Sequence, residues 1–342
     1  MPSTTISCVV DRQPRTYVDR DKGRRDIAMS EHSVAICVCT RRRPKMLRAC
    51  LDSLITQTPP EGWAIALIIV ENDDNPRCAN IVADFQKRAP YLIEYFNETE
   101  VGIPFARNAA IESVQALGSE WIAFIDDDEL AEPDWLLRLC GRSEQAGVDA
   151  VQGAARYEYP SQSPDWLPHL PLRRRESGCV LRTASTNNVM FRRTLTDDDG
   201  LGLRFDARFR FTGGSDSDFF SRATENGACI VWEQLAVVSE IVPHSRLRLG
   251  WQLKRAFRVA TNASEGELRR RGFMRALLRR MPKNVVRLIT GTALLPLTLL
   301  WPLGAPLRRI AFSGMKRFAS GLGGLAGLTS FRLEPYRLID GH

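Results

Sequence analysis

Short apolar stretches alternate with segments of helical periodicity from residue 34 to about residue 241. The apolar stretches are rich in aromatic and β-branched residues, which predicts buried strands. The predicted strands cover residues 34–39, 63–70, 91–96, 121–125, 149–156, 186–191 and 229–241. The predicted helices cover residues 44–55, 77–88, 102–117, 133–145 and 219–226. This alternation predicts an α/β fold with a mostly parallel, Rossmann-like sheet and right-handed crossovers.

Polar side chains follow three of the predicted strands at the point where each strand ends. Thr40 follows the first strand, the sequence Glu-Asn-Asp-Asp at 71–74 follows the second, and an acidic triplet at 126–128 follows the strand 121–125. Ligands of open α/β sheets bind beyond the carboxyl ends of the strands. We therefore expect these side chains to line one site.

The acidic triplet Asp126, Asp127 and Asp128 carries the candidate chemistry. Three carboxylates cannot stay buried without partners, because desolvating a charge is too costly. Oxygen ligands at this spacing suit Mg²⁺ or Mn²⁺, which keeps its other positions for water and the phosphates of a nucleotide diphosphate. The alternative interpretation is an acidic turn that caps the following helix.

Composition narrows the choice of partner and compartment. The net charge of +7 and the pI of about 9.1 indicate an acidic partner, such as a nucleic acid, an anionic lipid or a phosphate-bearing substrate. The eight cysteines are scattered without a CxxC pair, which argues against zinc and indicates reduced thiols in the cytosol. Residues 1–32 are polar and charged, and they predict a flexible N-terminal tail without a signal peptide.

The chain changes character after Ser245. Residues 246–283 are strongly basic, and residues 288–303 are uncharged and mostly apolar. The apolar run is shorter than the ~20 residues of a bilayer span, and basic residues flank both of its ends. We therefore predict a catalytic domain at 33–244 and a membrane-associating region at 245–342, which forms an interfacial helix or re-entrant hairpin. A single span and a buried helical subdomain are the alternatives.

Five motifs occur in the order and at the intervals typical of one enzyme family. They are Cys-Thr-Arg-Arg-Arg-Pro at 39–44, Val-Glu-Asn-Asp at 70–73, Gly-Ile-Pro-Phe-Ala-Arg-Asn at 102–108, Phe-Ile-Asp-Asp-Asp-Glu at 124–129 and Gly-Gly-Ser-Asp-Ser-Asp-Phe-Phe at 213–220. On these motifs, residues 34–258 resemble family 2 of the inverting glycosyltransferases, and within it the enzymes that extend lipid-linked exopolysaccharide repeat units. The resemblance implies a GT-A fold, a nucleotide-sugar donor that we expect to be a UDP-hexose, and Mn²⁺ or Mg²⁺ as cofactor.

The resemblance also assigns donor-binding roles. It implies that Asp126 and Asp128 bind the metal ion. It places the following residues at the nucleoside, although the family usually carries Asp at the first acidic position: Thr40, Glu71, Asp73 and Asp127.

Asp216 is the candidate general base. An inverting transfer needs one base that takes the proton of the acceptor hydroxyl. The family carries Glu directly before this aspartate, where this chain has Ser215. Asp218 is the rival candidate, and in the alternative interpretation both acids cap the helix that starts at Phe219.

Arg107 and Asn188 complete the predicted donor site. Arg107 is a planar, permanently charged donor that can pair with the diphosphate or stack near the base, and its alternative is a surface ion pair. Asn188 can contact the donor sugar or the acceptor, and it can equally satisfy buried backbone groups.

These features support three functions. The first is a metal-dependent glycosyltransferase at the cytoplasmic face of the plasma membrane, with a lipid-linked saccharide acceptor and an anionic membrane surface as partners and no nucleic acid. The second is a sugar-nucleotide nucleotidyltransferase, but no Gly-rich phosphate loop follows the first strand. The third is a non-enzymatic basic protein bound to a membrane or nucleic acid, which leaves the strand-end acids unexplained, because acids repel phosphate.

Overall fold

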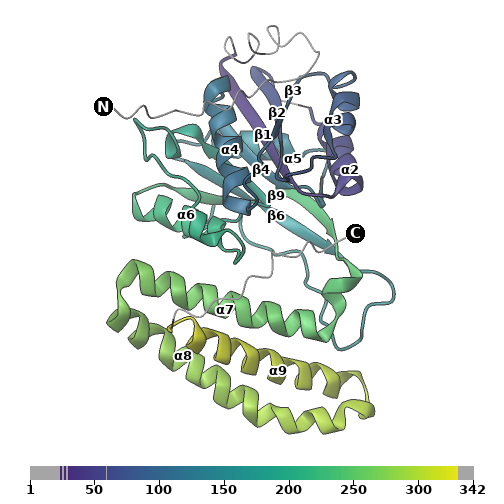
Figure 1. Cartoon of the computed structure of the whole chain (residues 1–342), viewed down its shortest axis with the longest axis vertical. Helices are drawn as coiled ribbons and strands as arrows, with labels where there is room; N and C mark the ends of the chain where they lie inside the picture. Colours follow the sequence, from purple (N-terminus) through teal and green to yellow (C-terminus); the bar gives the residue numbers. More distant parts are fainter. Residues whose placement is uncertain (1–23, 25–26, 28–29, 59, 330–342) are drawn as a thin grey trace, which may run out of the picture.

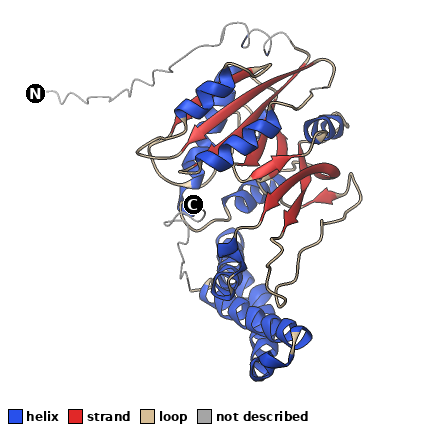
Figure 2. Ribbon diagram, turned by 90° about the vertical axis from the view of Figure 1, so that its right-hand side faces the viewer, coloured by secondary structure: helices blue, strands red, loops and turns tan. Residues whose placement is uncertain are grey.

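The structure of this chain, a computed structural model, describes residues 24, 27, 30–58 and 60–329. A sheet flanked by helices forms the upper part of the molecule, and a layer of long helices lies below it (Figures 1 and 2). The strands are β1 (His32–Thr40), β2 (Trp63–Glu71), β3 (Leu92–Asn97), β4 (Trp121–Asp126), β5 (Glu129–Ala131), β6 (Ala150–Glu158), β7 (Val180–Leu181), β8 (Asn188–Arg192) and β9 (Ile230–Ile241).

Helices lie between the strands and continue beyond the last one. The α-helices are α2 (Pro44–Leu54), α3 (Ala79–Gln86), α4 (Ile103–Leu117), α5 (Trp135–Ser143), α6 (Ser215–Glu225), α7 (Leu249–Arg271), α8 (Phe273–Leu294) and α9 (Ala305–Ala326). The short 3₁₀ helices are η1 (Arg193–Leu195), η2 (Ala207–Phe209), η3 (His244–Leu247) and η4 (Leu295–Leu303). The predicted α/β class is confirmed.

The described strands form a nine-stranded sheet with the order β3-β2-β1-β4-β8-β6-β9-β5, and β7 pairs with β9. β1 is parallel to β2 and β4, and β2 is parallel to β3. β8 runs antiparallel to both β4 and β6. The sheet is therefore mixed rather than mostly parallel. The reason is that segment 159–187, which leads into β8, contains no helix, and parallel neighbours need a crossover connection.

Both faces of the sheet are buried, which explains the nearly continuous apolar runs of the central strands. Successive side chains of a strand point to opposite faces. In β1, Ala35 and Cys37 join the core shared with α4 and α6, whereas Val34, Ile36 and Val38 join the core shared with α2, α3 and α5. The register of β1 is thus fixed from both sides.

The layer below the sheet consists of α7, α8 and α9, which pack through glycines of α9. A Cβ atom added at Gly314 would lie 2.5 Å from Cβ of Leu294 in α8, and one added at Gly323 would lie 2.1 Å from the carbonyl oxygen of Phe257 in α7. Only glycine allows backbones to approach this closely. The small residues of α9 therefore hold the three helices together.

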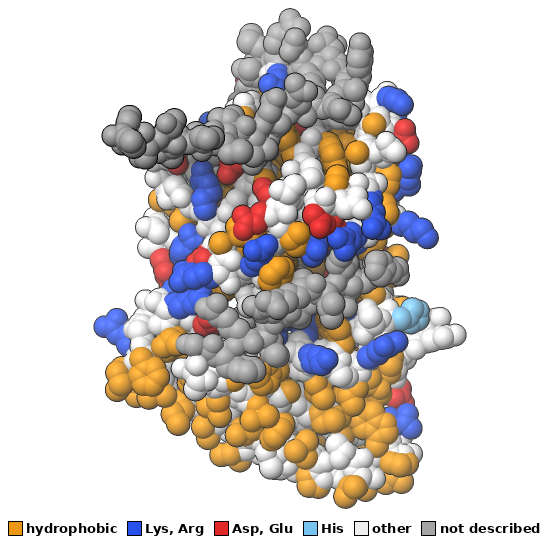
Figure 3. Space-filling view, in the orientation of Figure 1, with side chains coloured by type: hydrophobic (Ala, Val, Ile, Leu, Met, Phe, Trp, Pro, Cys, Tyr) orange, Lys and Arg blue, Asp and Glu red, His pale blue; other side chains and the backbone are white. Residues whose placement is uncertain are grey.

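Apolar side chains cover the outer face of this helical layer (Figure 3). Among the described residues, α8 and η4 together form one segment, Phe273–Leu303, that is long and apolar enough to cross a membrane by length and composition. It is longer than the predicted run 288–303, because the whole of α8 adds exposed apolar side chains. Leu278 is 71% exposed and Leu299 is 81% exposed.

Most of the predicted flexible tail, residues 1–32, lies outside the described residues. Of the described ones, Arg24 forms an ion pair of 2.8 Å with Glu94, and Ile27 is buried in the core. β1 begins at His32. The predicted boundaries between tail, catalytic domain and C-terminal region stay predictions.

Candidate active site

Three parallel strands end side by side at one edge of the sheet. Thr40 at the end of β1 is in register with Glu71 at the end of β2, and Cys39 is in register with Asp126 at the end of β4. The acidic triplet then forms the turn between β4 and β5. The register thus brings residues from three separate motifs to the edge where α/β proteins bind ligands.

Thr40 and Arg43 hold the second and third acids of the triplet. The Thr40 hydroxyl donates a hydrogen bond of 2.7 Å to Oδ2 of Asp127. The Arg43 guanidinium donates to Oδ1 of Asp127 at 3.1 Å and to Oδ2 of Asp128 at 3.3 Å. These contacts fix the positions of both carboxylates at the start of α2.

Burial makes the charged form of Asp126 and Asp127 unfavourable. Burial raises the pKa of Asp126 to about 7; the charge of Arg107 opposes this rise, and the charge of Asp128 adds to it. Burial also raises the pKa of Asp127 to about 6, although Arg43 lowers it. Crowded, desolvated carboxylates of this kind are stabilised by a cation.

Arg107 links this acidic turn to a second motif. Its Nη1 donates a hydrogen bond of 2.9 Å to Oγ of Ser215, the first residue of α6. The same guanidinium is close enough to Asp126 to lower its pKa. Arg107 therefore brings the end of β4 and the start of α6 together, and Asp216 is the next residue of that helix.

The two acids at the start of α6 are in different environments. Asp218 forms an ion pair of 2.9 Å with Arg222, one turn further along the same helix. Among the residues that the structure describes, neither a hydrogen bond nor an ion pair engages the Asp216 carboxylate. The N-cap of α6 is Gly214, and no side chain caps it. Asp216 is therefore the acid that is available to accept a proton.

Arg246 connects the acidic triplet to the segment that precedes α7. Its Nη2 lies 3.2 Å from Oδ2 of Asp128, and its Nη1 donates to Glu240 at the end of β9. Asp128 thus lies between two arginines, Arg43 and Arg246.

Asn262 of α7 supports the turn before Asp216. Its Nδ2 donates to the carbonyl oxygens of Thr212 at 3.1 Å and of Gly213 at 2.7 Å. Gly213 and Gly214 both have positive φ angles, 71° and 92°, which favour glycine. The side-chain amide of Asn262 therefore holds a turn that only glycines readily form.

Glu71 does not present a free carboxylate to the site. It is buried, and it accepts hydrogen bonds from the backbone N–H groups of Arg77 (2.8 Å) and Cys78 (2.9 Å) and from the Tyr95 hydroxyl (2.6 Å). These bonds order the loop that leads into α3. These bonds give Glu71 a structural role, and its nucleoside contact stays a prediction.

Asp73 is likewise held by protein groups. Arg42 donates to both of its oxygens, with one bond of 2.9 Å to Oδ1, and the backbone N–H of Asn75 also donates to it. Burial raises its pKa, but these bonds outweigh burial and hold the pKa well below its ordinary value. We expect Asp73 to position Arg42 rather than to contact a nucleoside directly.

Asn188 is fully buried within the sheet. Its amide donates to the carbonyl oxygens of Ala154 (2.9 Å) and Ala236 (2.8 Å), and it accepts from the indole N–H of Trp135 (2.8 Å). The carbonyl groups belong to strands β6 and β9, whose register shifts between Gly153 and Ala154. The alternative role, satisfying backbone groups, therefore explains Asn188 better than the predicted sugar contact.

Three contributors to this site were not among the predicted residues: Arg43, Arg246 and Asn262. Arg43 lies in the first motif, three residues after Thr40, so the sequence could have indicated that it belongs to the site. Arg246 and Asn262 lie in the basic segment that predicts membrane association, and their contacts depend on the tertiary fold.

Comparison with known proteins identifies the family. Residues 33–206 match the family described as Glycosyl transferase family 2. The succinoglycan biosynthesis protein ExoM of Rhizobium meliloti (strain 1021) is 33% identical over 229 residues, which cover 66% of this chain and 72% of that protein. The chain belongs to glycosyl transferase family 2. This assignment makes the protein a glycosyltransferase and replaces the two alternative functions.

Solved structures confirm the GT-A fold of the enzyme. The mannosyltransferase PcManGT from Pyrobaculum calidifontis, in complex with GDP-Man and Mn²⁺, is 16% identical with a TM-score of 0.56, covering 90% of this chain and 93% of that one. TarS 1–349 from S. aureus, in complex with UDP-GlcNAc, is 13% identical with a TM-score of 0.50, covering 85% of this chain and 90% of that one.

The acidic edge of the glycosyltransferase fits a divalent cation. Among the described residues, no group of three His, Cys, Asp or Glu side chains is arranged to hold an ion by protein ligands alone. Mg²⁺ in nucleotide sites needs only one or two carboxylates, since phosphates and water fill its other positions. The carboxylates of Asp126 and Asp128, crowded enough to raise the pKa of Asp126, match that requirement.

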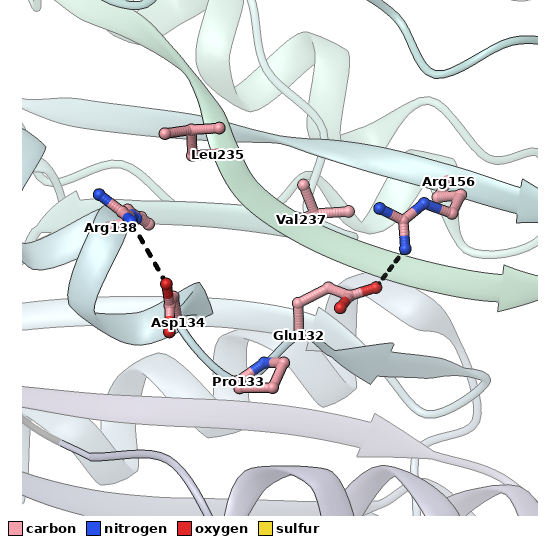
Figure 4. A pocket seen from close by; sticks show the side chains of 7 residues that line it. All are labelled: Glu132, Pro133, Asp134, Arg138, Arg156, Leu235 and Val237. Carbon is pink, nitrogen blue, oxygen red and sulfur yellow. Dashed lines mark hydrogen bonds and ion pairs between the residues drawn. The ribbon is translucent and has the colours of Figure 1, made fainter.

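A cavity of about 340 Å³ is lined by residues of segment 132–138 together with Arg156 of β6 and Leu235 and Val237 of β9 (Figure 4). Two ion pairs line it, Glu132 with Arg156 and Asp134 with Arg138. Its charges are therefore already compensated within the enzyme, and no predicted site residue lines it.

The raised pKa of Asp126 predicts a pH-dependent cost to stability. Its folded-state pKa of about 7 lies above the ordinary value of 3.8. The folded enzyme therefore binds more protons than the unfolded chain between these values, and the free energy of unfolding falls as the pH rises. Asp126→Asn removes this cost, so we expect the variant to gain stability over the wild type from about pH 4 to about pH 7.

Denaturant unfolding in EDTA at several pH values measures this gain. Asp73→Asn is the control of opposite sign. The pKa of Asp73 is lowered in the folded enzyme, so its carboxylate stabilises the fold at pH values above its ordinary pKa, and this contribution is lost as the pH falls. A stability difference for Asp126→Asn that stays constant over the whole pH range would contradict the electrostatic account.

Proposed function

We propose that this enzyme transfers a hexose from a UDP-sugar, with inversion, to a lipid-linked or growing saccharide in the synthesis of an exopolysaccharide. The observation that carries the proposal is the hydrogen bond between Arg107 and Ser215. It joins the acidic end of β4, which suits the donor, to the helix start that bears Asp216, which suits the acceptor. The 33% sequence identity to a succinoglycan biosynthesis protein supports a polysaccharide as the product.

Asp216 acts as the general base in the proposed reaction. Its carboxylate takes the proton of an acceptor hydroxyl while that oxygen attacks the anomeric carbon of the donor sugar. The bond between the anomeric carbon and the diphosphate oxygen breaks on the opposite face, and the nucleoside diphosphate leaves with the bonding electrons. One proton and one sugar are transferred, and the anomeric configuration inverts.

The donor side of the site consists of Thr40, Arg107, Asp126, Asp127 and Asp128 in this proposal. Thr40 and Asp127, bonded to each other, face the ribose. Arg107 offers its fixed positive charge to the diphosphate, where negative charge develops as the bond breaks. Mn²⁺ or Mg²⁺, when bound by Asp126 and Asp128, neutralises the diphosphate.

We propose that the helical layer holds the enzyme at the cytoplasmic face of a membrane. Residues 269–333 contain no Asp or Glu, and the exposed apolar side chains of α8 and η4 form one face (Figure 3). An apolar face accompanied by cations binds the interface of an anionic bilayer. We favour an interfacial hairpin of α8, η4 and α9, because the glycine contacts keep α9 packed against α8. The cations lie along both helices: Arg275, Arg279, Arg280, Lys283, Arg287, Arg308 and Arg309.

A donor screen tests the proposed activity. The purified enzyme is incubated with Mn²⁺ or Mg²⁺ and a panel of UDP-, GDP- and dTDP-sugars, and the released nucleotide is measured. We expect slow release of UDP from one UDP-hexose and no release after EDTA treatment. Release from a GDP-sugar only would contradict the uridine donor, and full activity in EDTA would contradict the metal ion.

The assignment of the base is tested with Asp216→Asn. We expect turnover to fall by about a hundredfold or more, as is typical for loss of a general base, and the donor dissociation constant measured by calorimetry to stay unchanged. Asp218→Asn is the matched control, since it makes the same change two residues away and removes only the pair with Arg222. Comparable turnover by Asp216→Asn and the wild type would disprove the assignment.

Membrane association is tested by placing charges on the apolar face. We expect the double variant Leu278→Asp/Leu299→Asp to lose binding to phosphatidylglycerol vesicles in a flotation assay, because burying a charge in the acyl region is costly. Val180→Asp is the control, since Val180 is also 71% exposed but belongs to the sheet domain. Unchanged flotation of the double variant would show that this face does not enter the membrane.

A further inference from the structure

Helices α7 and α9 pack in parallel, with a fixed register. The hydroxyl of Ser320 in α9 lies 3.5 Å from the carbonyl oxygen of Ala256 in α7. Five residues further along α7, the Thr261 hydroxyl donates to the carbonyl oxygen of Gly323 at 2.9 Å. Helical side chains lean toward the N-terminus of their own helix. The register therefore directs the side chain one turn before Ser320, that of Lys316, toward the N-terminal turns of α7, which carry Arg255.

Arg255 and Lys316 form a pair of like charges at this junction. The burial of the Lys316 stem and the positive charge of Arg255 lower the pKa of the lysine. The stem packs on Phe312, with Nζ 5.9 Å from the ring centroid. Within the part of the chain that the structure describes, no ion pair engages Arg255 or Lys316. One acid near Arg255 is Glu240: burial raises its pKa and the charge of Arg255 opposes this rise, but Glu240 is already paired with Arg246. Positive charge is therefore in excess at Arg255 and Lys316, which suits an anion.

This pair lies between the strand-end acids and the membrane-facing hairpin. The Trp251 ring is contacted by two guanidinium groups: its centroid lies 5.8 Å from Cζ of Arg246 and 5.5 Å from Cζ of Arg255. Arg246 in turn reaches Asp128 at 3.2 Å. Lys316, on the other side, belongs to α9 of the hairpin. The order from the site outward is therefore Asp128, Arg246, Arg255 and Lys316.

We propose that Arg255 and Lys316 bind the diphosphate of the lipid-linked acceptor. The inference rests on the proposed function, which supplies the lipid-linked acceptor. Such an acceptor has an apolar tail in the bilayer and a saccharide that must reach Asp216. A diphosphate at the membrane surface joins these two parts. The planar fork of Arg255 suits two phosphate oxygens, and the point charge of Lys316 suits another. The pair thus fixes where the acceptor enters the enzyme.

Titration of the full-length enzyme with farnesyl diphosphate, a short polyprenyl diphosphate, tests the site. EDTA is present, so that no cation draws the probe to the acidic triplet. The test variant is Arg255→Gln/Lys316→Gln. The control is Lys254→Gln/Arg317→Gln, which removes the same charge from neighbouring exposed positions of the same two helices. Thermal unfolding of both variants shows whether they are folded.

We expect calorimetry to show that the test variant binds farnesyl diphosphate about tenfold or more weakly than the wild type, because charge-assisted hydrogen bonds are lost. The affinity of the control variant should change by less than about twofold. The wild type should bind farnesyl diphosphate more tightly than farnesol. Equal losses in both variants, or equal affinity for diphosphate and alcohol, would overturn the proposal.

Vesicles of phosphatidylglycerol distinguish the acceptor diphosphate from an ordinary lipid headgroup. Equal vesicle binding by the test and control variants supports the acceptor site. Selective loss of vesicle binding by the test variant assigns the pair to phospholipid headgroups and overturns the proposal. The titration needs no sugar transfer, so its failure leaves the proposed activity standing, and failure of the donor screen leaves the titration interpretable.

Discussion

The charge of Arg107 is the constraint on which the rest of the site depends. Asp126 and Asp127 at the end of β4 are crowded and desolvated, and burial raises the pKa of both carboxyl groups. Arg107 offsets part of that cost at Asp126 and at the same time donates to Ser215. One guanidinium therefore connects the acidic edge of the sheet to a helix start that lies far away in the sequence. An inverting transfer needs such a connection, because base and leaving group act on opposite faces of one sugar.

The helical layer contacts the candidate active site and also carries the exposed apolar face. Consecutive residues of α7 serve both purposes: Thr261 bonds to Gly323 of α9, and Asn262 bonds to the turn before Asp216. Arg246, just before α7, reaches Asp128. The position of α9 relative to the sheet is therefore coupled, through α7, to the position of Asp216 relative to the acidic triplet. In the proposed reaction, the same helix would align a lipid-linked acceptor with the catalytic groups.

Much of the fold follows from local sequence patterns, and the site follows from them in part. Apolar runs with two buried faces predict the parallel strands, and their register predicts that Thr40 and Asp126 end at the same edge. The antiparallel insertion of β8 is not predictable in this way, because it depends on the path of a long segment without helices. The direction of a strand is a tertiary property.

The same difference explains why the sequence leaves two roles open for Glu71 and Asn188. Both are polar residues at strand ends, which is also where ligand contacts occur. What decides their role is the set of partners, and for Asn188 these are Trp135 and two backbone carbonyl groups from other strands. A buried side chain whose hydrogen bonds are all satisfied within the protein has no capacity left for a ligand. Asp216 shows the opposite case: Asp218 is paired with Arg222, whereas Asp216 has no hydrogen-bond or ion-pair partner among the described residues.

Ser215 gives a chemical reason for the departure from the family pattern. A glutamate before Asp216 would place a second negative charge beside Arg107 and would pair with it directly. The serine hydroxyl instead accepts a hydrogen bond from Arg107 without adding a charge. More of the positive charge of Arg107 then remains for Asp126 and for an incoming diphosphate, since a neutral acceptor compensates a cation less than a carboxylate does. The site thereby keeps the geometry that joins its two halves and directs its electrostatic attraction toward the donor.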